Sequence, residues 1–413
     1  MNKKTFTKNI LLIGGIISAI SLFMLSCAGP GDENKENGGH ATPTSINKTK
    51  PVVKVYIENS GSMEGYINTD FRRQLGLYLT HIGSVSEITD SLSLNFINRK
   101  IIPIPSSQVT DFIDKLNPHA FRMLGGSRES SDISEMLDTI CPRTKNEVVI
   151  FVSDCIFSPG RGKNAEDYLS HQQMGIMGTM KSMKKKMPSS PAVVIYRVLG
   201  DFKGNYYDKN NAPQEWRKKR PYYIWLIGSK ENLMDFVNQV PFENPDRVCM
   251  ISSLDKSINY AVVPGGGNYS VSKNSPHAID RAKVDSKSGR MVVKVKVNFS
   301  NILQPNEYLE DISNYVLSDR QFSIDKIEKC GLDKFTHIIT LSSKNVKRGK
   351  LKIQLKNYLP SWIEEYNDDM GYSLAEYNDN LEKTYGLKCM VDGVYDVFTY
   401  ENKNLAEIEI SIN

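Results

Sequence analysis

Between residues 52 and 242 the chain alternates between two patterns of apolar and polar positions. Short β-branched runs, clearest in VVKVYIE at residues 52–58 and EVVIFVSD at residues 147–154, are separated by segments whose apolar residues return every three or four positions. The second pattern places apolar side chains on one face of a helix, and continuous apolar runs are typical of strands buried on both faces. This alternation predicts βαβ units, and therefore an α/β fold with a doubly wound, mostly parallel sheet.

The same patterns give the bounds of the individual elements. Strands are predicted at residues 52–58, 92–96, 101–105, 147–154, 191–199 and 221–228, and helices at residues 71–82, 109–116, 133–140, 164–187 and 233–240. The third strand contains two prolines, which cannot donate to a strand ladder, so it belongs at a sheet edge. Residues 200–220 lack a helical period, and loops of that length are usually functional or mobile. In this loop Tyr206, Tyr207 and Trp216 would form either a contact surface or a lid packed on the domain.

After residue 243 strand patterns follow one another without regular intervening helices. Apolar and polar positions alternate clearly in VKVKVNF at residues 293–299 and in LKIQL at residues 351–355, so one face of each strand is expected to be solvated. Several such strands separated by turns predict an antiparallel sandwich that resembles immunoglobulin-like domains. The expected organisation is an α/β domain over residues 51–243 and a smaller β-rich domain, with a helical insertion, over residues 244–413.

The first 26 residues have the pattern of a secretion signal. Lys3, Lys4 and Lys8 precede an apolar run at residues 10–25, and the segment ends in MLSC. The run is short for a membrane span, and its small residue before a cysteine resembles the lipobox of bacterial lipoproteins. This resemblance implies cleavage before Cys27 and lipidation of the Cys27 thiol. Residues 27–50 contain almost no large apolar side chains and are expected to form a disordered tether.

Acidic residues follow the lipobox closely. Asp32, Glu33 and Glu36 form a pattern that resembles the surface-export signals of Bacteroidetes lipoproteins. The resemblance implies a protein of the cell envelope, lipid-anchored to the outer membrane and exposed at the cell surface.

Charge and cysteine content narrow the function classes. Removal of the signal lowers the formal net charge from +5 to +2, which leaves no basic field that would call for nucleic acid. The basic cluster at residues 217–220 is expected to be a solvated loop. Five cysteines follow Cys27 without a close pair, a spacing that fits neither a zinc site nor a disulfide framework. They are interpreted as mostly buried thiols with at most two bridges.

Oxygen-bearing side chains gather at the end of the first predicted strand. Glu58, Ser60 and Ser62 follow one another at alternate positions in the sequence ENSGSMEG. Hard cations such as Mg²⁺ prefer carboxylate, hydroxyl and water oxygens, so Glu58-x-Ser60-x-Ser62 is a candidate for part of an octahedral site. Two later segments can contribute further oxygens, because Ser131 lies in a glycine-rich loop and Asp154 ends an apolar strand.

These three segments resemble the metal-ion-dependent adhesion site of the von Willebrand factor A domain, which begins Asp-x-Ser-x-Ser after the first strand. Glu58 stands in place of the leading aspartate, Ser131 in place of a threonine, and Asp154 where the family has its last acidic ligand. The resemblance implies a Mg²⁺ or Mn²⁺ ion held by Glu58, Ser60, Ser62, Ser131 and Asp154, with the carboxylates acting directly or through water. An open coordination position would then accept a carboxylate from a protein or other ligand.

The loop before residue 133 has a second interpretation. Ser130 and Ser131 can cap the helix that follows, and Asp132 with Glu135 has the spacing of a capping box. On that interpretation the serines stabilise the helix and bind no ion.

Three functions remain open on this sequence. The favoured one is an envelope-anchored lipoprotein that binds a protein or other carboxylate-bearing ligand through the metal site and breaks no bond. The second is a structural or assembly component of the cell envelope that keeps the fold without metal. The third, a metal-assisted hydrolase, is weakest because no histidine lies near the motifs and no G-x-S-x-G or Ser/His/Asp arrangement is readable. The chain is therefore expected not to be an enzyme.

Overall fold

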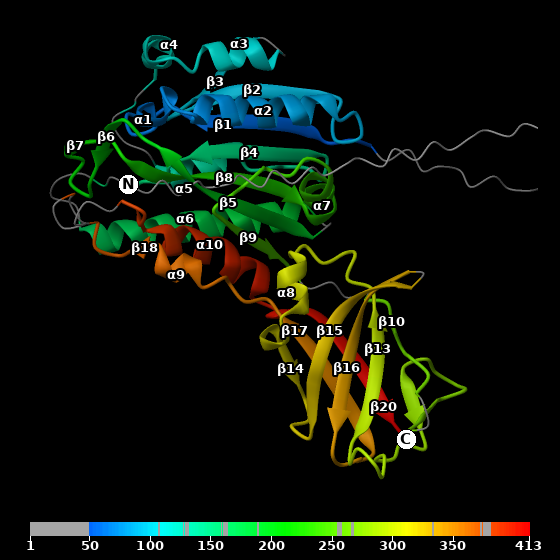
Figure 1. The fold of residues 1–413 in the computed structure, drawn as a ribbon. Helices are drawn as coiled ribbons and strands as arrows, with labels where there is room; N and C mark the ends of the chain where they lie inside the picture. The colour runs from blue at the N-terminus through cyan, green and yellow to red at the C-terminus, as the bar shows by residue number, and fades with distance from the viewer. Residues whose placement is uncertain are drawn as a thin grey trace, which may run out of the picture. The chain divides into compact units, whose positions relative to one another are not determined.

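The computed structural model describes residues 49–413, apart from 106–107, 127, 129–131, 158, 160–163, 188–189, 254–257, 266–267, 333, 372–373 and 375–380. A seven-stranded sheet in the order β3-β2-β1-β4-β8-β5-β9 carries the candidate site (Figure 1). Its strands are β1 (Val52–Glu58), β2 (Ser91–Ile97), β3 (Ile101–Pro103), β4 (Glu147–Ser153), β5 (Pro191–Asp201), β8 (Lys219–Ser229) and β9 (Arg247–Ser252).

Strand β1 lies between two parallel neighbours, β2 and β4. The registers place Glu58 beside Ile97 of β2 and Ile57 beside Val152 of β4. The other four pairings of the sheet are antiparallel, so the expectation of a mostly parallel sheet was wrong. The cause is the connection between β5 and β8. It forms a hairpin of β6 (Gly204–Tyr207) and β7 (Pro213–Trp216) instead of a helix, so β8 returns antiparallel to β5.

Each face of the sheet has its own apolar core. Along β1 the side chains of Val53, Val55 and Ile57 enter the first core and that of Tyr56 enters the second, as the two-residue repeat of a strand requires. The first core is covered by α1 (Glu64–Ile67), α2 (Phe71–Ser84), α3 (Val109–Asp114), α4 (Pro118–Met123) and α7 (Lys230–Gln239). The second is covered by α5 (Ile133–Ile140), α6 (Ala165–Lys186), α9 (Trp362–Glu365) and α10 (Leu387–Thr399). Helices on both faces confirm the predicted α/β class.

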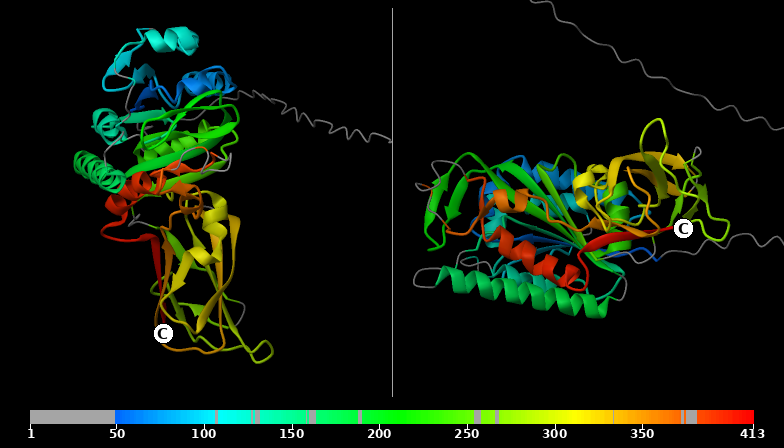
Figure 2. Two further views of the ribbon diagram at one scale, coloured as in Figure 1. Left: turned by 90° about the vertical axis from the view of Figure 1, so that its left-hand side faces the viewer. Right: turned by 90° about the horizontal axis from the view of Figure 1, so that it is seen from below.

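The helices expected as an insertion in the β-rich region belong to the second core. Helix α10 lies beside α6 on the same face of the sheet (Figure 2). The Trp362 indole of α9 donates a hydrogen bond to the carbonyl of Val248 in β9 at 3.1 Å. Strand β9, which follows the boundary expected at residue 243, is itself an edge strand of the sheet. The α/β part of the structure therefore includes segments from both sides of residue 243. Helix α6 precedes that residue and α10 follows it, and the two helices bury apolar side chains in the same core.

The remaining described strands form a β-rich region around a third core. One sheet has the order β10-β13-β16-β15 and the other has the order β11-β12-β20-β17-β14. Their bounds are β10 (Tyr260–Val262), β11 (Ser270–Val271), β12 (Ala278–Asp280), β13 (Met291–Val297), β14 (Tyr315–Leu317), β15 (Phe322–Leu332), β16 (Phe335–Ser343), β17 (Gly349–Lys356) and β20 (Asn404–Ile412). Side chains of both sheets share the core, and alternate residues of β13 are buried, as its sequence pattern predicts.

Short elements complete the described chain. Helix α8 (Asn306–Glu310) and a 3₁₀ turn (Ile312–Asn314) precede β14, while β18 (Asn367–Asp368) and β19 (Thr384–Tyr385) form a small parallel pair. The five cysteines after residue 27 are free thiols, and three of them are buried, which agrees with the interpretation as mostly buried thiols with at most two bridges. Within the described part of the chain, no helix combines the length and apolarity needed to cross a bilayer.

Candidate functional site

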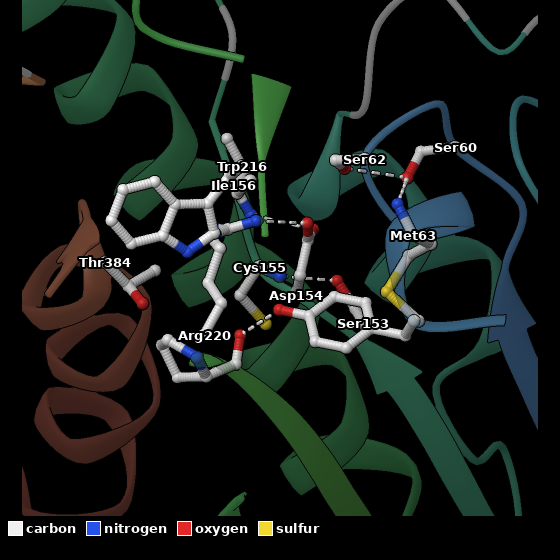
Figure 3. Close-up of polar contacts among 12 residues, drawn as sticks. Ser60, Ser62, Met63, Ser153, Asp154, Cys155, Ile156, Trp216, Arg220 and Thr384 are labelled. Atoms are coloured by element: carbon white, nitrogen blue, oxygen red, sulfur yellow. Dashed lines mark hydrogen bonds and ion pairs between the residues drawn. The ribbon is translucent and has the colours of Figure 1, made fainter. Parts of the chain in front are cut away.

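The loops that follow β1 and β4 leave the sheet at one edge. Because the two strands are parallel neighbours, their carboxyl ends lie together, and Ser60, Ser62 and Asp154 all emerge there (Figure 3). The Oγ atoms of Ser60 and Ser62 lie 3.1 Å apart, and the Met63 amide donates a hydrogen bond to Ser60 Oγ at 3.3 Å. The sheet thus brings two of the expected hydroxyls and one expected carboxylate to the same edge.

Asp154 is an ion-pair partner in this arrangement. Its Oδ2 atom accepts a hydrogen bond from Arg220 Nη1 at 3.0 Å, and its Oδ1 atom accepts one from the Ile156 amide at 3.4 Å (Figure 3). Both charged side chains are 1% exposed. The negative charge at the end of β4 is therefore already matched by a buried guanidinium.

Arg220 reaches this position from the start of β8. Its guanidinium carbon lies 5.0 Å from the ring centre of Tyr206 and 5.5 Å from that of Phe202. Burial by itself would lower the pKa of Arg220, but the influence of Tyr66 and Asp154 outweighs it, and the pKa is raised above its usual value. The group is a permanent positive charge held between aromatic rings.

Glu58 points its carboxylate at β4. The side chain is fully buried, and the Ser153 hydroxyl donates a hydrogen bond to Glu58 Oε2. The Cys155 amide in turn donates to Ser153 Oγ at 2.7 Å. The carboxylate at the end of β1 is thus tied to the neighbouring strand, at the position where the family has a shorter aspartate.

Asn59 is an unsatisfied polar residue in the same loop. Its side chain is fully buried, and neither the amide nitrogen nor the amide oxygen has a hydrogen-bond partner among the described residues. Leaving such a group unpaired costs about 1–3 kcal/mol. Native structures contain few of these groups, and those that occur often mark a functional site.

Two predicted functional residues, Ser131 and Cys27, lie outside the described residues. The nearest described residues on either side of Ser131 are Arg128 and Asp132. Arg128 Nη2 donates to the Ser60 carbonyl at 3.1 Å, and Asp132 accepts the Glu135 amide at 2.9 Å as the N-cap of α5. The capping role predicted for Asp132 is therefore confirmed.

The two carboxylates expected to hold a metal ion, those of Glu58 and Asp154, already contact other side chains of the protein. Ser153 binds Glu58 and Arg220 binds Asp154, which leaves the neutral hydroxyls of the two serines. In the described part of the chain no three His, Cys, Asp or Glu side chains form a cluster suited to a metal. Hydroxyls without an available carboxylate are a poor set for Mg²⁺, so the described residues in this arrangement do not fit the expected ion. Metal binding stays a prediction, and it would require Asp154 to exchange Arg220 for the ion.

A polar cavity of about 600 Å³ opens beside the two serines. Its walls come from the β1 loop, α1, the start of α4, the loop before α5 and the β6–β7 hairpin. The charged residues that line it are Glu64, Arg122, Arg128, Lys203 and Glu215. This cavity adjoins two of the predicted site residues, Ser60 and Ser62.

The charge of the cavity is positive overall. Glu64 accepts hydrogen bonds from Arg122 Nε at 2.6 Å and from Arg128 Nη2 at 3.0 Å, so one carboxylate faces two guanidinium groups. Burial would raise the pKa of Glu64, but the two arginines lower it below its usual value. Glu215 is paired with Arg217, and the exposed Lys203 ammonium makes no ion pair with a described residue. Of the five charged residues that line the cavity, three are basic and two are acidic, so one positive charge is in excess.

The β6–β7 hairpin closes one side of the cavity. A Cβ atom on Gly204 would lie 2.6 Å from Gly65 Cα, and the Lys203 amide donates to the Gly65 carbonyl at 2.8 Å, so the hairpin packs directly on α1. Tyr206 and Trp216 are buried, whereas Tyr207 lines the cavity. Both interpretations of this loop hold in part, because two of its aromatic residues pack as a lid and the third is available for contact.

Sequence reasoning missed the basic residues of the site. Arg220 was expected in a solvated loop, which was wrong because β8 begins at Lys219 and carries the Arg220 side chain inward. Arg122 and Arg128 come from segments whose spacing gave no signal of a shared cavity.

No protein-family model, curated protein or solved structure matches this chain. The resemblance to the von Willebrand factor A domain therefore depends on the residues at the ends of β1 and β4.

Proposed function

We propose that this protein is a lipid-anchored envelope protein that binds an acidic ligand in the cavity beside Ser60 and Ser62 and does not catalyse a reaction. The observation that supports the proposal most is the excess positive charge of that cavity, at the carboxyl ends of two adjacent parallel strands. Ligands of α/β sheets characteristically bind outside the carboxyl ends of the strands.

The chemistry of the cavity favours a carboxylate-bearing ligand. Arg122 and Arg128 share one carboxylate, so each keeps donor N–H groups that a ligand carboxylate can accept from. Lys203 adds a mobile point charge, and the hydroxyls of Ser60 and Ser62 can donate or accept. The partly engaged arginines are positioned before a ligand arrives, which lowers the entropy lost on binding.

The anchor is part of the same proposal. Lipidation at Cys27 and a tether to residue 50 would hold the binding domain at the outer membrane, facing the cell surface. One lipid chain gives only marginal attachment, but a lipoprotein carries several, so the attachment would be stable.

We also infer that the α/β part is related to von Willebrand A-like domains and the β-rich part to immunoglobulin-like sandwiches. The placement of Ser60, Ser62 and Asp154 at one sheet edge supports the first, and two sheets around one core support the second. The antiparallel strand β8 departs from the doubly wound pattern. Relatives of this chain with aspartate at position 58 and the serine pair retained would support the relationship, and relatives that lack both serines would contradict it.

A metal-free structural or assembly role is the second candidate. The pairing of Asp154 with Arg220 favours it, because Arg220 neutralises the Asp154 carboxylate without any ligand. The two candidates differ in the cavity, since an assembly role does not require Arg122 or Lys203 to contact a ligand.

The test is binding of an acidic probe to the purified full-length protein in detergent. A penta-glutamate peptide should bind and a penta-glutamine peptide should not. The double variant R122Q/K203Q should weaken binding at least tenfold, because each charge-assisted hydrogen bond contributes about 1.5–3 kcal/mol. The matched control is R73Q, since Arg73 on α2 is exposed to a similar degree as Arg122, 67% against 61%, and lies outside the cavity. Equal affinity of R122Q/K203Q and wild type would exclude this cavity as the binding site.

A further inference from the structure

The buried pair of Asp154 and Arg220 stands where the resemblance would place a divalent ion and its acidic ligand. The two groups are 3.0 Å apart, and neither side chain is more than 1% exposed. A buried carboxylate without a compensating charge is strongly unfavourable, and here a guanidinium supplies that charge.

Two aromatic rings and a carboxylate hold Arg220 in place. The rings of Tyr206 and Phe202 lie against its guanidinium, and both belong to the connection between β5 and β8. The hydroxyl of Tyr66 donates a hydrogen bond to the carbonyl of Pro221 at 2.6 Å, which fixes the backbone immediately after Arg220. The Tyr66 ring also packs edge-on against Phe202, with ring centres 4.9 Å apart. Arg220 is therefore packed against the base of the hairpin.

A divalent cation and Arg220 compete for the same carboxylate. With Arg220 in place, a cation bound at Asp154 would meet a like charge a few ångströms away. Its other nearby ligands would be the neutral hydroxyls of Ser60 and Ser62, because Glu58 is fully buried and its Oε2 atom accepts a hydrogen bond from Ser153. Mg²⁺ requires an octahedral set of oxygens and favours carboxylates among them.

We propose that Arg220 is the resident cation of this site, so that ligand capture in the adjoining cavity needs no divalent metal. The inference rests on the proposed function, because it describes how the same site binds its acidic ligand. Arg220 is a positioning residue here. It holds Asp154 and the end of β4, while the ligand contacts Arg122, Arg128 and Lys203, which line the cavity.

The first test uses the wild-type protein alone. Titration with Mn²⁺, followed by the electron paramagnetic resonance signal of the free ion, should detect no stoichiometric site. Binding of the penta-glutamate peptide should be the same in EDTA as in millimolar Mg²⁺. A one-to-one Mn²⁺ site that is lost in D154N, or peptide binding abolished by EDTA, would overturn the proposal.

The second test removes the guanidinium. In R220M the Asp154 carboxylate loses its partner, so this variant should acquire a Mn²⁺ site and melt at a higher temperature with Mn²⁺ than with EDTA. The matched control is R197M, which removes another arginine that is 1% exposed, on the neighbouring strand β5, and should acquire no such site. Folded R220M that binds no Mn²⁺ would overturn the assignment, because another group would then exclude the ion. If R220M does not fold, the wild-type titration decides.

The two proposals fail in different ways. If wild type binds no penta-glutamate in any buffer, the proposed function fails, while the Mn²⁺ titration still decides the role of Arg220. If the peptide binds only with Mg²⁺ present, the proposed function stands and the role of Arg220 as resident cation is refuted.

Discussion

Replacement of Arg220 by methionine tests the energetic importance of the buried pair. The substitution keeps most of the side-chain volume but leaves Asp154 charged and without its partner in an environment that is 1% exposed. Breaking a buried pair in this way costs about 3–5 kcal/mol. Surface pairs contribute about 0–1 kcal/mol, so the exposed Arg73, which pairs with Asp70, gives a control variant, R73Q, that should change little.

The double variant D154L/R220M separates the pair from the individual residues. It replaces both charges by apolar side chains of similar volume, an exchange that is often neutral or stabilising for buried pairs. We therefore expect the double variant to be more stable than R220M alone, with a coupling free energy of about 2–3 kcal/mol between the two positions.

Urea unfolding followed by tryptophan fluorescence provides the measurement. Trp216 is a suitable reporter because its indole donates a hydrogen bond to the carbonyl of Lys219, the residue before Arg220. The reasoning is refuted if R220M and R73Q lose the same stability, or if the single losses of D154L and R220M simply add in the double variant.

Three further predictions concern other parts of the chain. The two arginines that pair with Glu64 lower its pKa below 4.5. The stability that these pairs contribute is therefore fully present above pH 4.5 and is lost as the pH falls through the lowered pKa. Between pH 7 and pH 3, urea unfolding should show a loss of stability of up to about 1 kcal/mol from these pairs that is absent in E64Q. G204A should lose about 1–3 kcal/mol, because its Cβ atom would clash with the backbone of Gly65, whereas G178A, in open space on α6, should gain about 0.5–1 kcal/mol; equal effects in thermal melts would contradict the tight packing of the hairpin. C27A should abolish incorporation of radiolabelled palmitate and release the protein from the membrane fraction, and labelled C27A would disprove the lipobox.

The features that the sequence predicts correctly are those that depend on short stretches of neighbouring residues. The apolar run at residues 52–58 became β1 and the run at residues 147–153 became β4, because continuous β-branched segments are stable only as buried strands. Asp132 became a helix cap because its side chain reaches an amide only three residues away. Local pattern was likewise sufficient to place Ser60, Ser62 and Asp154 at strand ends, and hence at one edge of the sheet.

Local sequence patterns did not predict which charged residues meet at the site. Arg220 lies 66 residues from Asp154 in the sequence, and their contact arises only because β8 inserts beside β4 instead of following it in a parallel crossover. Whether the connection at residues 202–218 forms a helix or an extended hairpin is decided by what it packs against, here Gly65 and the ring of Tyr66. No local period encodes that choice.

The sequence by itself determined the alternation of strands and helices, the edge of the sheet from which the two serines and Asp154 emerge, and the residue that begins α5. Only the tertiary structure decided that Ser153 takes the Glu58 carboxylate, that a buried arginine neutralises Asp154, and that arginines from separate segments share one cavity. The physical reason is the distance along the sequence over which each effect acts. Backbone pattern acts over a few residues, whereas the partner of a buried charge is whichever group the folded chain brings within about 3 Å.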